Sequence, residues 1–144
     1  MLHKQISVFI ENKRGRLAEI TKVLGDNGVD MRALCIADTK DFGILRIISD
    51  KPELAERALR DRGYAVSITD VIAVLVDDRP GGLAAALGVL DECEINIEYM
   101  YHFIRNRSDT VAIIIRVENP VEALERIKKT PLSLLPADGL DGAV

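Results

Sequence analysis

Two stretches of the sequence, ENKRGRLAEI (residues 11–20) and DDRPGGLAAA (residues 77–86), decide the fold. In each stretch, alternating apolar residues give way to helical spacing at a glycine, and these glycines, Gly15 and Gly81, are 66 residues apart. Alternation with a period of two indicates a strand, and apolar residues three to four positions apart indicate a helix. The same strand-to-helix turn therefore occurs twice, which predicts a tandem repeat.

The repeat extends along the chain. At an offset of 66, apolar residues of the first copy fall on apolar residues of the second, and these pairs are Ile6 and Ile72, Val8 and Val74, Ile10 and Val76, Leu17 and Leu83, and Leu24 and Leu90. Beyond the turn RNRSD (residues 105–109) the offset becomes 68, because Pro52 matches Pro120. Two copies are too few for a solenoid. The pattern predicts one domain over residues 1–70, a second over 71–136, and a loose tail over 137–144.

Each copy has the order β-α-β-β-α-β. In the first copy the predicted strands are residues 5–11, 31–37, 43–49 and 64–70, with helices after Gly15 and from Pro52, where Ser49 or Asp50 is the expected cap. This order predicts an α+β fold of two ferredoxin-like domains, antiparallel sheets with helices on one face. No Gly- or Pro-rich linker separates the copies, so we expect them to pair side by side in a sheet of about eight strands. The segment PLSLLP, residues 131–136, is expected to be an edge strand.

Composition excludes several function classes. A net charge of −4 gives no general attraction for nucleic acid, and no apolar run reaches the roughly 18 residues of a membrane span. There is no signal-peptide pattern, which favours the cytoplasm. Cys35 and Cys93 fit no metal-ligand spacing. His3 is expected at a frayed terminus, and no nucleophile and base pair is visible. We therefore expect no enzyme activity, no catalytic residues, no metal and no cofactor.

The two turns share the pattern Asn/Asp-x-x-Gly-x-Leu at residues 12–17 and 78–83. With the β-α-β-β-α-β order, this pattern resembles tandem ACT domains, regulatory modules that bind amino acids. The second turn keeps the Arg-Pro-Gly form of the family, whereas the first has Arg14 where proline is usual. The resemblance implies a regulatory or sensor protein that binds a free amino acid, acts on a separate protein partner and forms a homodimer.

The chemistry of the turn agrees with this resemblance. The first turn of a helix leaves N–H groups without an intrahelical partner, and with the helix dipole they suit a carboxylate. Gly15 and Gly81 allow close approach of a ligand because they lack a Cβ atom. Asn12 or Asp78 is placed to accept a hydrogen bond from an ammonium group. The alternative, that the glycines only shape a tight turn, remains open.

The stretch INIEYMYHF contributes the other predicted part of the site. By alternation one face holds Ile95, Ile97, Tyr99, Tyr101 and Phe103, where the tyrosines either fill the core or line a pocket shared between the domains. A pocket that combines the Asn12 loop with this strand is preferred over its mirror pocket. The full predicted ligand-binding set is Asn12, Arg14, Gly15, Arg16, Leu17, Leu34, Cys35, Ile36, Asp78, Pro80, Gly81, Gly82, Leu83, Tyr99, Met100 and Tyr101.

Two other function classes share this topology. A small ferredoxin-like enzyme is disfavoured because no catalytic pair is visible. An RNA-binding module needs basic strands with exposed stacking aromatics, and only YMYHF hints at them. The doubled turn favours the amino-acid-binding class.

Overall fold

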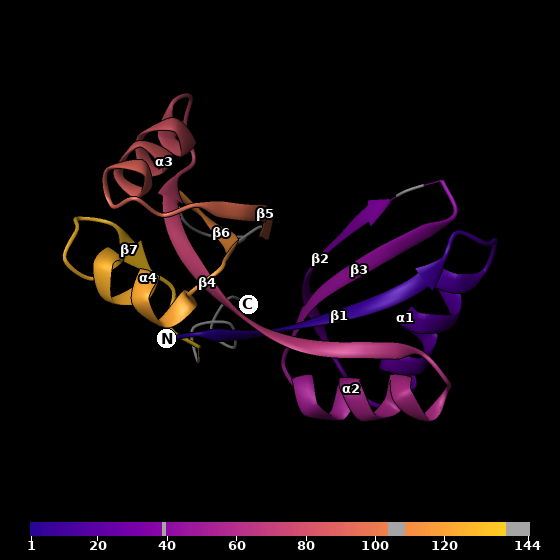
Figure 1. Ribbon diagram of the computed structural model, residues 1–144. Helices are drawn as coiled ribbons and strands as arrows, with labels where there is room; N and C mark the ends of the chain where they lie inside the picture. The colour runs from indigo at the N-terminus through magenta and orange to yellow at the C-terminus, as the bar shows by residue number, and fades with distance from the viewer. Residues whose placement is uncertain (39, 104–108, 138–144) are drawn as a thin grey trace. The chain divides into compact units, whose positions relative to one another are not determined.

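The computed structural model describes residues 1–38, 40–103 and 109–137, and Figure 1 shows the arrangement of their helices and strands. In chain order these are β1 (His3–Glu11), α1 (Arg16–Asp26), β2 (Met31–Asp38), β3 (Phe42–Ser49), α2 (Pro52–Asp61), β4 (Ala65–Asp77), α3 (Gly82–Glu92), β5 (Ile97–Phe103), β6 (Thr110–Val117), α4 (Pro120–Ile127) and β7 (Ser133–Leu134). Most of the turn RNRSD and all but the first residue of the predicted tail lie outside the described residues.

Strand β4 belongs to both compact units of the chain. Residues 4–69 form one unit, called here the N-terminal unit, and residues 70–144 with residues 1–3 form the C-terminal unit. The boundary falls inside the 13-residue strand β4, which serves as the last strand of one unit and the first strand of the other. The described residues therefore contain seven strands instead of about eight.

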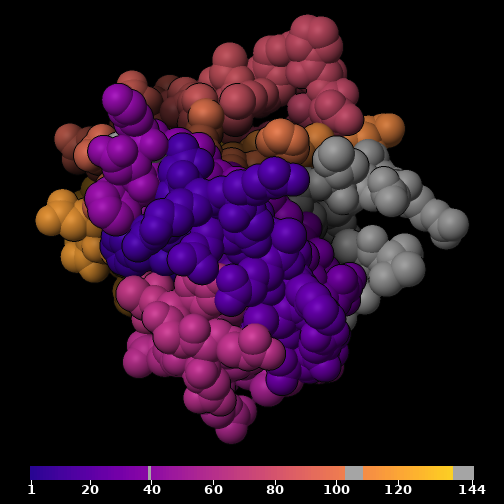
Figure 2. All heavy atoms as spheres, turned by 90° about the vertical axis from the view of Figure 1, so that its right-hand side faces the viewer, coloured from indigo at the N-terminus to yellow at the C-terminus, as the bar shows by residue number. Residues whose placement is uncertain are grey.

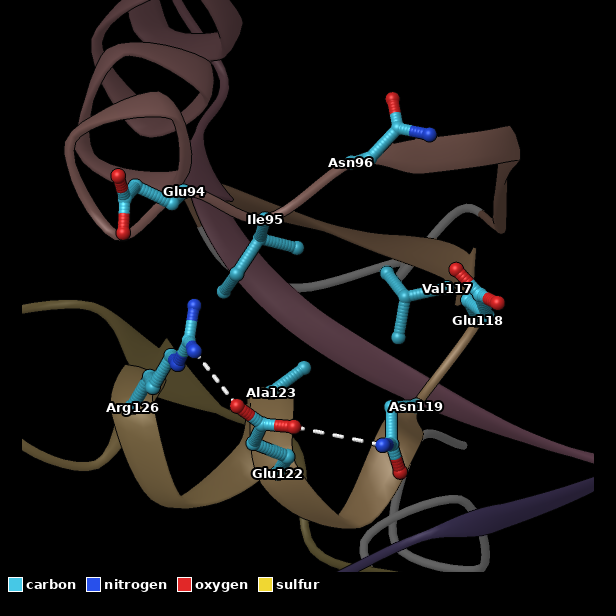
Figure 3. Close-up of a pocket in the computed structure, with 9 residues that line it drawn as sticks. All are labelled: Glu94, Ile95, Asn96, Val117, Glu118, Asn119, Glu122, Ala123 and Arg126. Carbon is cyan, nitrogen blue, oxygen red and sulfur yellow. Dashed lines mark hydrogen bonds and ion pairs between the residues drawn. The ribbon is translucent and has the colours of Figure 1, made fainter.

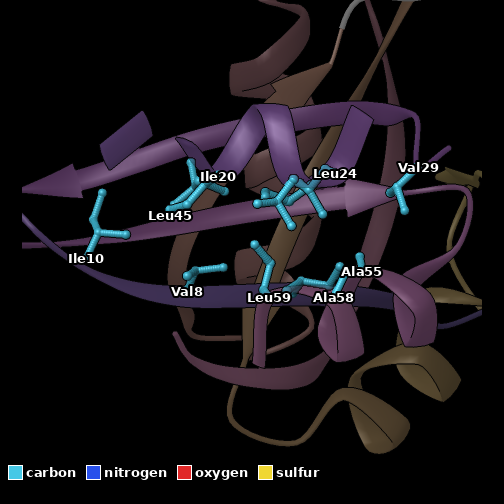
Figure 4. Packing of buried hydrophobic residues seen from close by; sticks show 12 residues of the cluster. Val8, Ile10, Ile20, Leu24, Val29, Leu45, Ala55, Ala58 and Leu59 are labelled. Atoms are coloured by element: carbon cyan, nitrogen blue, oxygen red, sulfur yellow. The ribbon is translucent and has the colours of Figure 1, made fainter. Parts of the chain in front are cut away.

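The N-terminal unit has the strand order β2-β3-β1-β4, which is the ferredoxin-like order. Strand β3 pairs antiparallel with β1, so that Ile6 lies opposite Ile47 and Val8 opposite Leu45. These residues face helices α1 and α2 in one buried cluster, to which Leu59 also belongs (Figure 4). The two helices lie next to each other in the space-filling view (Figure 2). Both helices therefore cover one face of the sheet, as the alternation in the sequence predicts.

The C-terminal unit repeats this arrangement with β5, β6, β4 and β7 in neighbouring positions. Ile72, Val74 and Val76 of β4 pack with residues of α3 and α4 in a second buried cluster. Strand β7 pairs with β4 through Leu134 and Val74, which confirms the short strand expected within residues 131–136. Both second helices of the repeat begin with proline, at Pro52 and Pro120. Lys51, instead of Ser49 or Asp50, is the N-cap of α2.

A β-bulge in β5 changes which side chains share a face. Ile97 pairs with Val117, and the register shifts so that Tyr99 pairs with Arg116. Ile97 and Val117 belong to the core beneath the helices, whereas Tyr99 and Tyr101 point to the opposite face because one residue is inserted. The prediction of one shared face for Ile95, Ile97 and both tyrosines is therefore wrong.

The same bulge occurs in β2, between Met31 and Ala33. Strands β2 and β5 are also the outermost strands of their units, so they are edge strands and not central ones. Leu34 pairs with the core residue Ile47 and lies on the helix-covered face, yet half of its surface is exposed.

The first three residues of the chain are ordered within the C-terminal unit. Leu2 packs against the second core cluster, and His3 is buried, with its Nε2 2.8 Å from the Leu135 carbonyl oxygen. The expectation of a frayed terminus is wrong at His3. Its imidazole forms a hydrogen bond with the segment that follows β7.

Candidate functional site

The two strand-to-helix loops have the same pattern of backbone hydrogen bonds. In each loop four backbone N–H groups donate to carbonyl oxygens at matched positions. In the first loop these bonds are Asn12 to Asp41 (3.0 Å), Lys13 to Glu11 (2.8 Å), Arg16 to Lys13 (3.3 Å) and Glu19 to Gly15 (3.0 Å). In the second they are Asp78 to Asp109 (2.7 Å), Arg79 to Asp77 (3.0 Å), Gly82 to Arg79 (3.0 Å) and Ala85 to Gly81 (3.0 Å). The repeat seen in the sequence is thus a repeat of hydrogen bonds.

Gly15 and Gly81 occupy the N-cap positions of α1 and α3 with φ of 88° and 84°. Residues with a Cβ rarely adopt this left-handed conformation, whereas glycine adopts it readily. A Cβ atom built on either glycine meets no other atom within 4 Å. Each glycine therefore allows the left-handed backbone angle, and the space where a side chain would lie is open. Neither helix start receives a side-chain capping bond, so the first-turn N–H groups are suited to an anion.

Asn12 ties the first loop to the β2–β3 turn. Its Nδ2 donates to the Lys40 carbonyl oxygen at 3.2 Å. Arg14 is exposed, and Arg16 lies 3.5 Å from Glu19 in an exposed ion pair. Leu17, at the start of α1, is 41% exposed.

The charges beside Gly15 give this loop a positive balance. The Lys13 ammonium lies 2.7 Å from the Glu11 carboxylate. Its hydrogen bond and charge lower the pKa of that carboxyl group. Lys13, Arg14 and Arg16 exceed Glu11 and Glu19 by one charge, so the surroundings of this helix start favour an anion.

The second loop is tighter and more acidic. Asp77 is paired with Arg79 at 3.2 Å, and Asp78 adds a second negative charge before Pro80. A Cβ atom on Gly82 would lie 2.1 Å from the Asp77 carbonyl oxygen, closer than any real contact. Arg16 occupies the matched position of the first loop, so that loop accommodates a side chain where the second does not.

The predicted strand residues divide between the two sheet faces. Leu34 and Ile36 of β2, with Met100 of β5, lie on the helix-covered face and are exposed by 50%, 39% and 42%. Cys35 lies on the other face opposite Arg46. Burial raises the pKa of the Cys35 thiol, although the Arg46 guanidinium acts in the opposite direction, so this cysteine is not activated. Tyr99 is half-buried and Tyr101 is buried.

Across the described residues, no three His, Cys, Asp or Glu side chains come together to hold a metal ion. No helix in this part of the chain is long and apolar enough to cross a membrane.

A pocket of about 390 Å³ in the C-terminal unit, called here the α4 pocket, is missing from the sequence prediction. It lies between the connection from α3 to β5 and the start of α4, and Figure 3 shows its lining side chains. These are Glu94, Ile95, Asn96, Val117, Glu118, Asn119, Glu122, Ala123 and Arg126. The signal that could have revealed it is the difference between the copies, in which Gly28 and Lys51 of the first match Glu94 and Asn119 of the second.

Two ferredoxin-like units whose first helices each start at a left-handed glycine define the class of fold, and comparison with known proteins identifies the family. The family model described as an ACT domain pair matches residues 1–141. The chain therefore belongs to the ACT domain pair family, a class of regulatory module, which confirms the resemblance and the fold class. No curated protein matches the sequence.

Solved structures include similar chains. Protein BT0572 from Bacteroides thetaiotaomicron is 44% identical over 97% of this chain and 96% of that chain, with a TM-score of 0.90. The regulatory subunit of aspartate kinase from Thermus thermophilus, in its ligand-free form, is 17% identical over 88% and 91%, with a TM-score of 0.65. Its counterpart from Thermus flavus is 18% identical over 90% and 92%, with a TM-score of 0.63. The two kinase subunits share the fold with this chain.

Proposed function

We propose that this protein is a regulatory protein that binds a free amino acid at the loop of residues 12–17. The observation that carries the proposal is the helix start at Gly15, which combines a left-handed glycine, open space and no side-chain cap. A ligand carboxylate placed there accepts hydrogen bonds from N–H groups of the first helical turn. It also lies at the positive end of the helix dipole. Arg14 and Arg16 add positive charge, and Asn12 Oδ1 is the acceptor for the ligand ammonium.

The second loop is the weaker candidate in this proposal. Asp78 and Asp77 repel a carboxylate, and Arg79 is the cation that opposes them among residues 77–83 of the loop. Pro80, Gly81, Gly82 and Leu83 complete this loop. The participation of Leu34, Cys35, Ile36, Tyr99, Met100 and Tyr101 as pocket walls stays a prediction from the sequence.

Isothermal titration against the twenty amino acids tests the proposal. We expect one amino acid, or a small related group, to bind with about one tight site per chain. Gly15→Val should abolish binding because a branched side chain obstructs the ligand and is strained at positive φ. Gly81→Val carries the same strain at the weaker loop and is the matched control. Equal loss in both variants would contradict the ranking of the loops, and no binding of any amino acid would contradict the proposal.

We further propose that the ligand-bound form acts on a separate protein in the cytoplasm and that the chain forms a homodimer. The exposed edge strands β2 and β5 support self-association, since unpaired strand edges are common sites of pairing. Sedimentation velocity with and without the bound amino acid tests the proposed homodimer. A monomer at all concentrations would contradict it.

A further inference from the structure

The α4 pocket lies at the opposite end of its sheet from the strand-to-helix loop. Asp77, where the loop begins, pairs with Thr110 at the start of β6, whereas Val117 of the pocket ends β6. The pocket is therefore separate from the strand-to-helix loop of its own unit, and its lining residues include none of residues 12–17, the amino-acid site proposed above. Its volume, about 390 Å³, lies within the usual range for small-molecule sites.

The N-terminal unit shows what occupies the equivalent place. There the Lys51 side chain crosses from the start of α2, and its Nζ donates to the Gly28 carbonyl oxygen at 2.8 Å. The same ammonium lies 3.9 Å from the Asp50 carboxylate. Asp50 in turn accepts a bond from the Asp30 N–H at 2.8 Å. An ammonium group supplied by the chain itself thus joins the two connections of this unit.

The C-terminal unit has carboxylates at this place but no lysine at the position that matches Lys51. The offsets of the repeat place Glu94 at Gly28, Glu118 at Asp50 and Asn119 at Lys51. Glu94 has φ of 56°, close to the 68° of Gly28, so the backbone that presents the carbonyl oxygen is retained although glutamate is strained there.

Asn119 does not replace the lysine. Its Nδ2 donates to Glu122 at 3.3 Å, within its own helix α4 (Figure 3). Arg126 is the cation among the residues lining the pocket, and its bonds go to the Cys93 carbonyl oxygen and to Glu122. The residues lining the pocket therefore carry one guanidinium and three carboxylates, those of Glu94, Glu118 and Glu122.

We propose that the α4 pocket binds a small primary alkylammonium ion from solution, which takes the place that Lys51 Nζ fills in the N-terminal unit. The ammonium donates to the Glu94 carbonyl oxygen and is attracted by the Glu118 carboxylate. The alkyl chain lies against Ile95, Val117 and Ala123. The excess of carboxylates disfavours ligands that carry a carboxylate of their own.

Titration of the full chain with n-butylamine, a soluble analogue of the lysine side chain, tests this site by NMR. We expect saturable shifts of the backbone amides of Ile95 and Glu118, and no such shifts with n-butanol or butyrate. Equal shifts with n-butanol, or no saturable shift with n-butylamine, would overturn the proposal.

Two variants locate the ligand. Asn119→Lys supplies an internal ammonium and should weaken n-butylamine binding about tenfold or more, whereas Asn119→Gln, its uncharged control, should preserve it. Glu118→Gln should also weaken binding, and it leaves the pocket shape unchanged. Wild-type affinity in both Asn119→Lys and Glu118→Gln would contradict the assignment. Gly15→Val should bind n-butylamine normally, so loss of the amino-acid site and loss of this site are distinguishable.

Discussion

His3 and Leu135, which are 132 residues apart in the chain, are joined by a hydrogen bond of 2.8 Å between the imidazole Nε2 and a carbonyl oxygen. Because a carbonyl oxygen only accepts, Nε2 carries the hydrogen and Nδ1 is the unprotonated nitrogen. Nδ1 is buried and has no hydrogen-bond partner among the described residues. The bond therefore holds a neutral imidazole in a place where a second proton would lack a partner.

The first prediction is that acid weakens the C-terminal unit through His3. Burial lowers the pKa of His3 below its ordinary value of 6.5. As the pH falls through 6.5, the unfolded chain takes up a proton on this imidazole before the folded chain does. The contribution of His3 to stability is therefore complete above that pH and decreases below it. The free energy of unfolding, measured by urea titration between pH 8 and pH 5, should fall less steeply in His3→Gln.

His102 provides the matched control for this experiment, because it is the other histidine of the chain and is exposed. His102→Gln should keep the pH dependence of the wild type. An identical pH dependence in wild type and His3→Gln would show that the buried imidazole does not titrate as argued.

The second prediction concerns the left-handed glycine of the first loop. Gly15→Ala should lower the free energy of unfolding by about 1–2 kcal/mol, since alanine is strained at φ of 88° while its methyl group enters open space. Gly25→Ala is the control within helix α1, where the added methyl group meets no atom within 4 Å beyond its chain neighbours and the helix's own backbone. It should stabilise the unit by up to about 1 kcal/mol. A stabilising Gly15→Ala would mean that the loop readily adopts another backbone angle.

The third prediction separates the two loops by packing. Gly82→Ala should lower the free energy of unfolding by about 1–3 kcal/mol, because its Cβ would meet the Asp77 carbonyl oxygen at 2.1 Å. Arg16→Ala, at the matched position of the first loop, removes an exposed ion pair and should cost less than about 1 kcal/mol. Thermal denaturation of the two variants measures the difference, and equal costs would argue against the tighter second loop.

The fourth prediction tests the Lys51 bridge. Lys51→Met should lower the free energy of unfolding by about 1 kcal/mol, since it removes the bond to the Gly28 carbonyl oxygen. Lys22→Met removes an exposed pair with Asp26 on α1 and should cost no more than about 0.5 kcal/mol. If the two lysine variants unfold alike in guanidinium, the bridge contributes nothing beyond an ordinary surface charge.

The repeat and the order of strands and helices were predictable from the sequence because apolar periodicity and turn glycines are local signals. The glycine turns at Gly15 and Gly81 belong to the same class of signal. The face of Tyr99 was not predictable in this way, because a single inserted residue at the bulge reverses alternation without leaving a mark in composition.

Contacts between residues far apart in the chain were also not predictable from the sequence. Nothing near His3 indicates that its partner is Leu135, and a terminal histidine ordinarily suggests a loose end. The difference between the copies at the α4 pocket is that Asn119 of the second copy stands where the first has Lys51. Only a position-by-position comparison of the two copies reveals this difference. The proposed amino-acid site rests on the family and on the chemistry of the first loop.

The assignment of residues 1–3 to the C-terminal unit has a consequence for the newly made chain. Synthesis proceeds from the N-terminus, so residues 4–69 can complete their unit while the rest is still being translated. His3 leaves the ribosome before the rest of the C-terminal unit, and its partner Leu135 follows 132 residues later. The His3 side chain must therefore remain without its native partner until these residues have been synthesised.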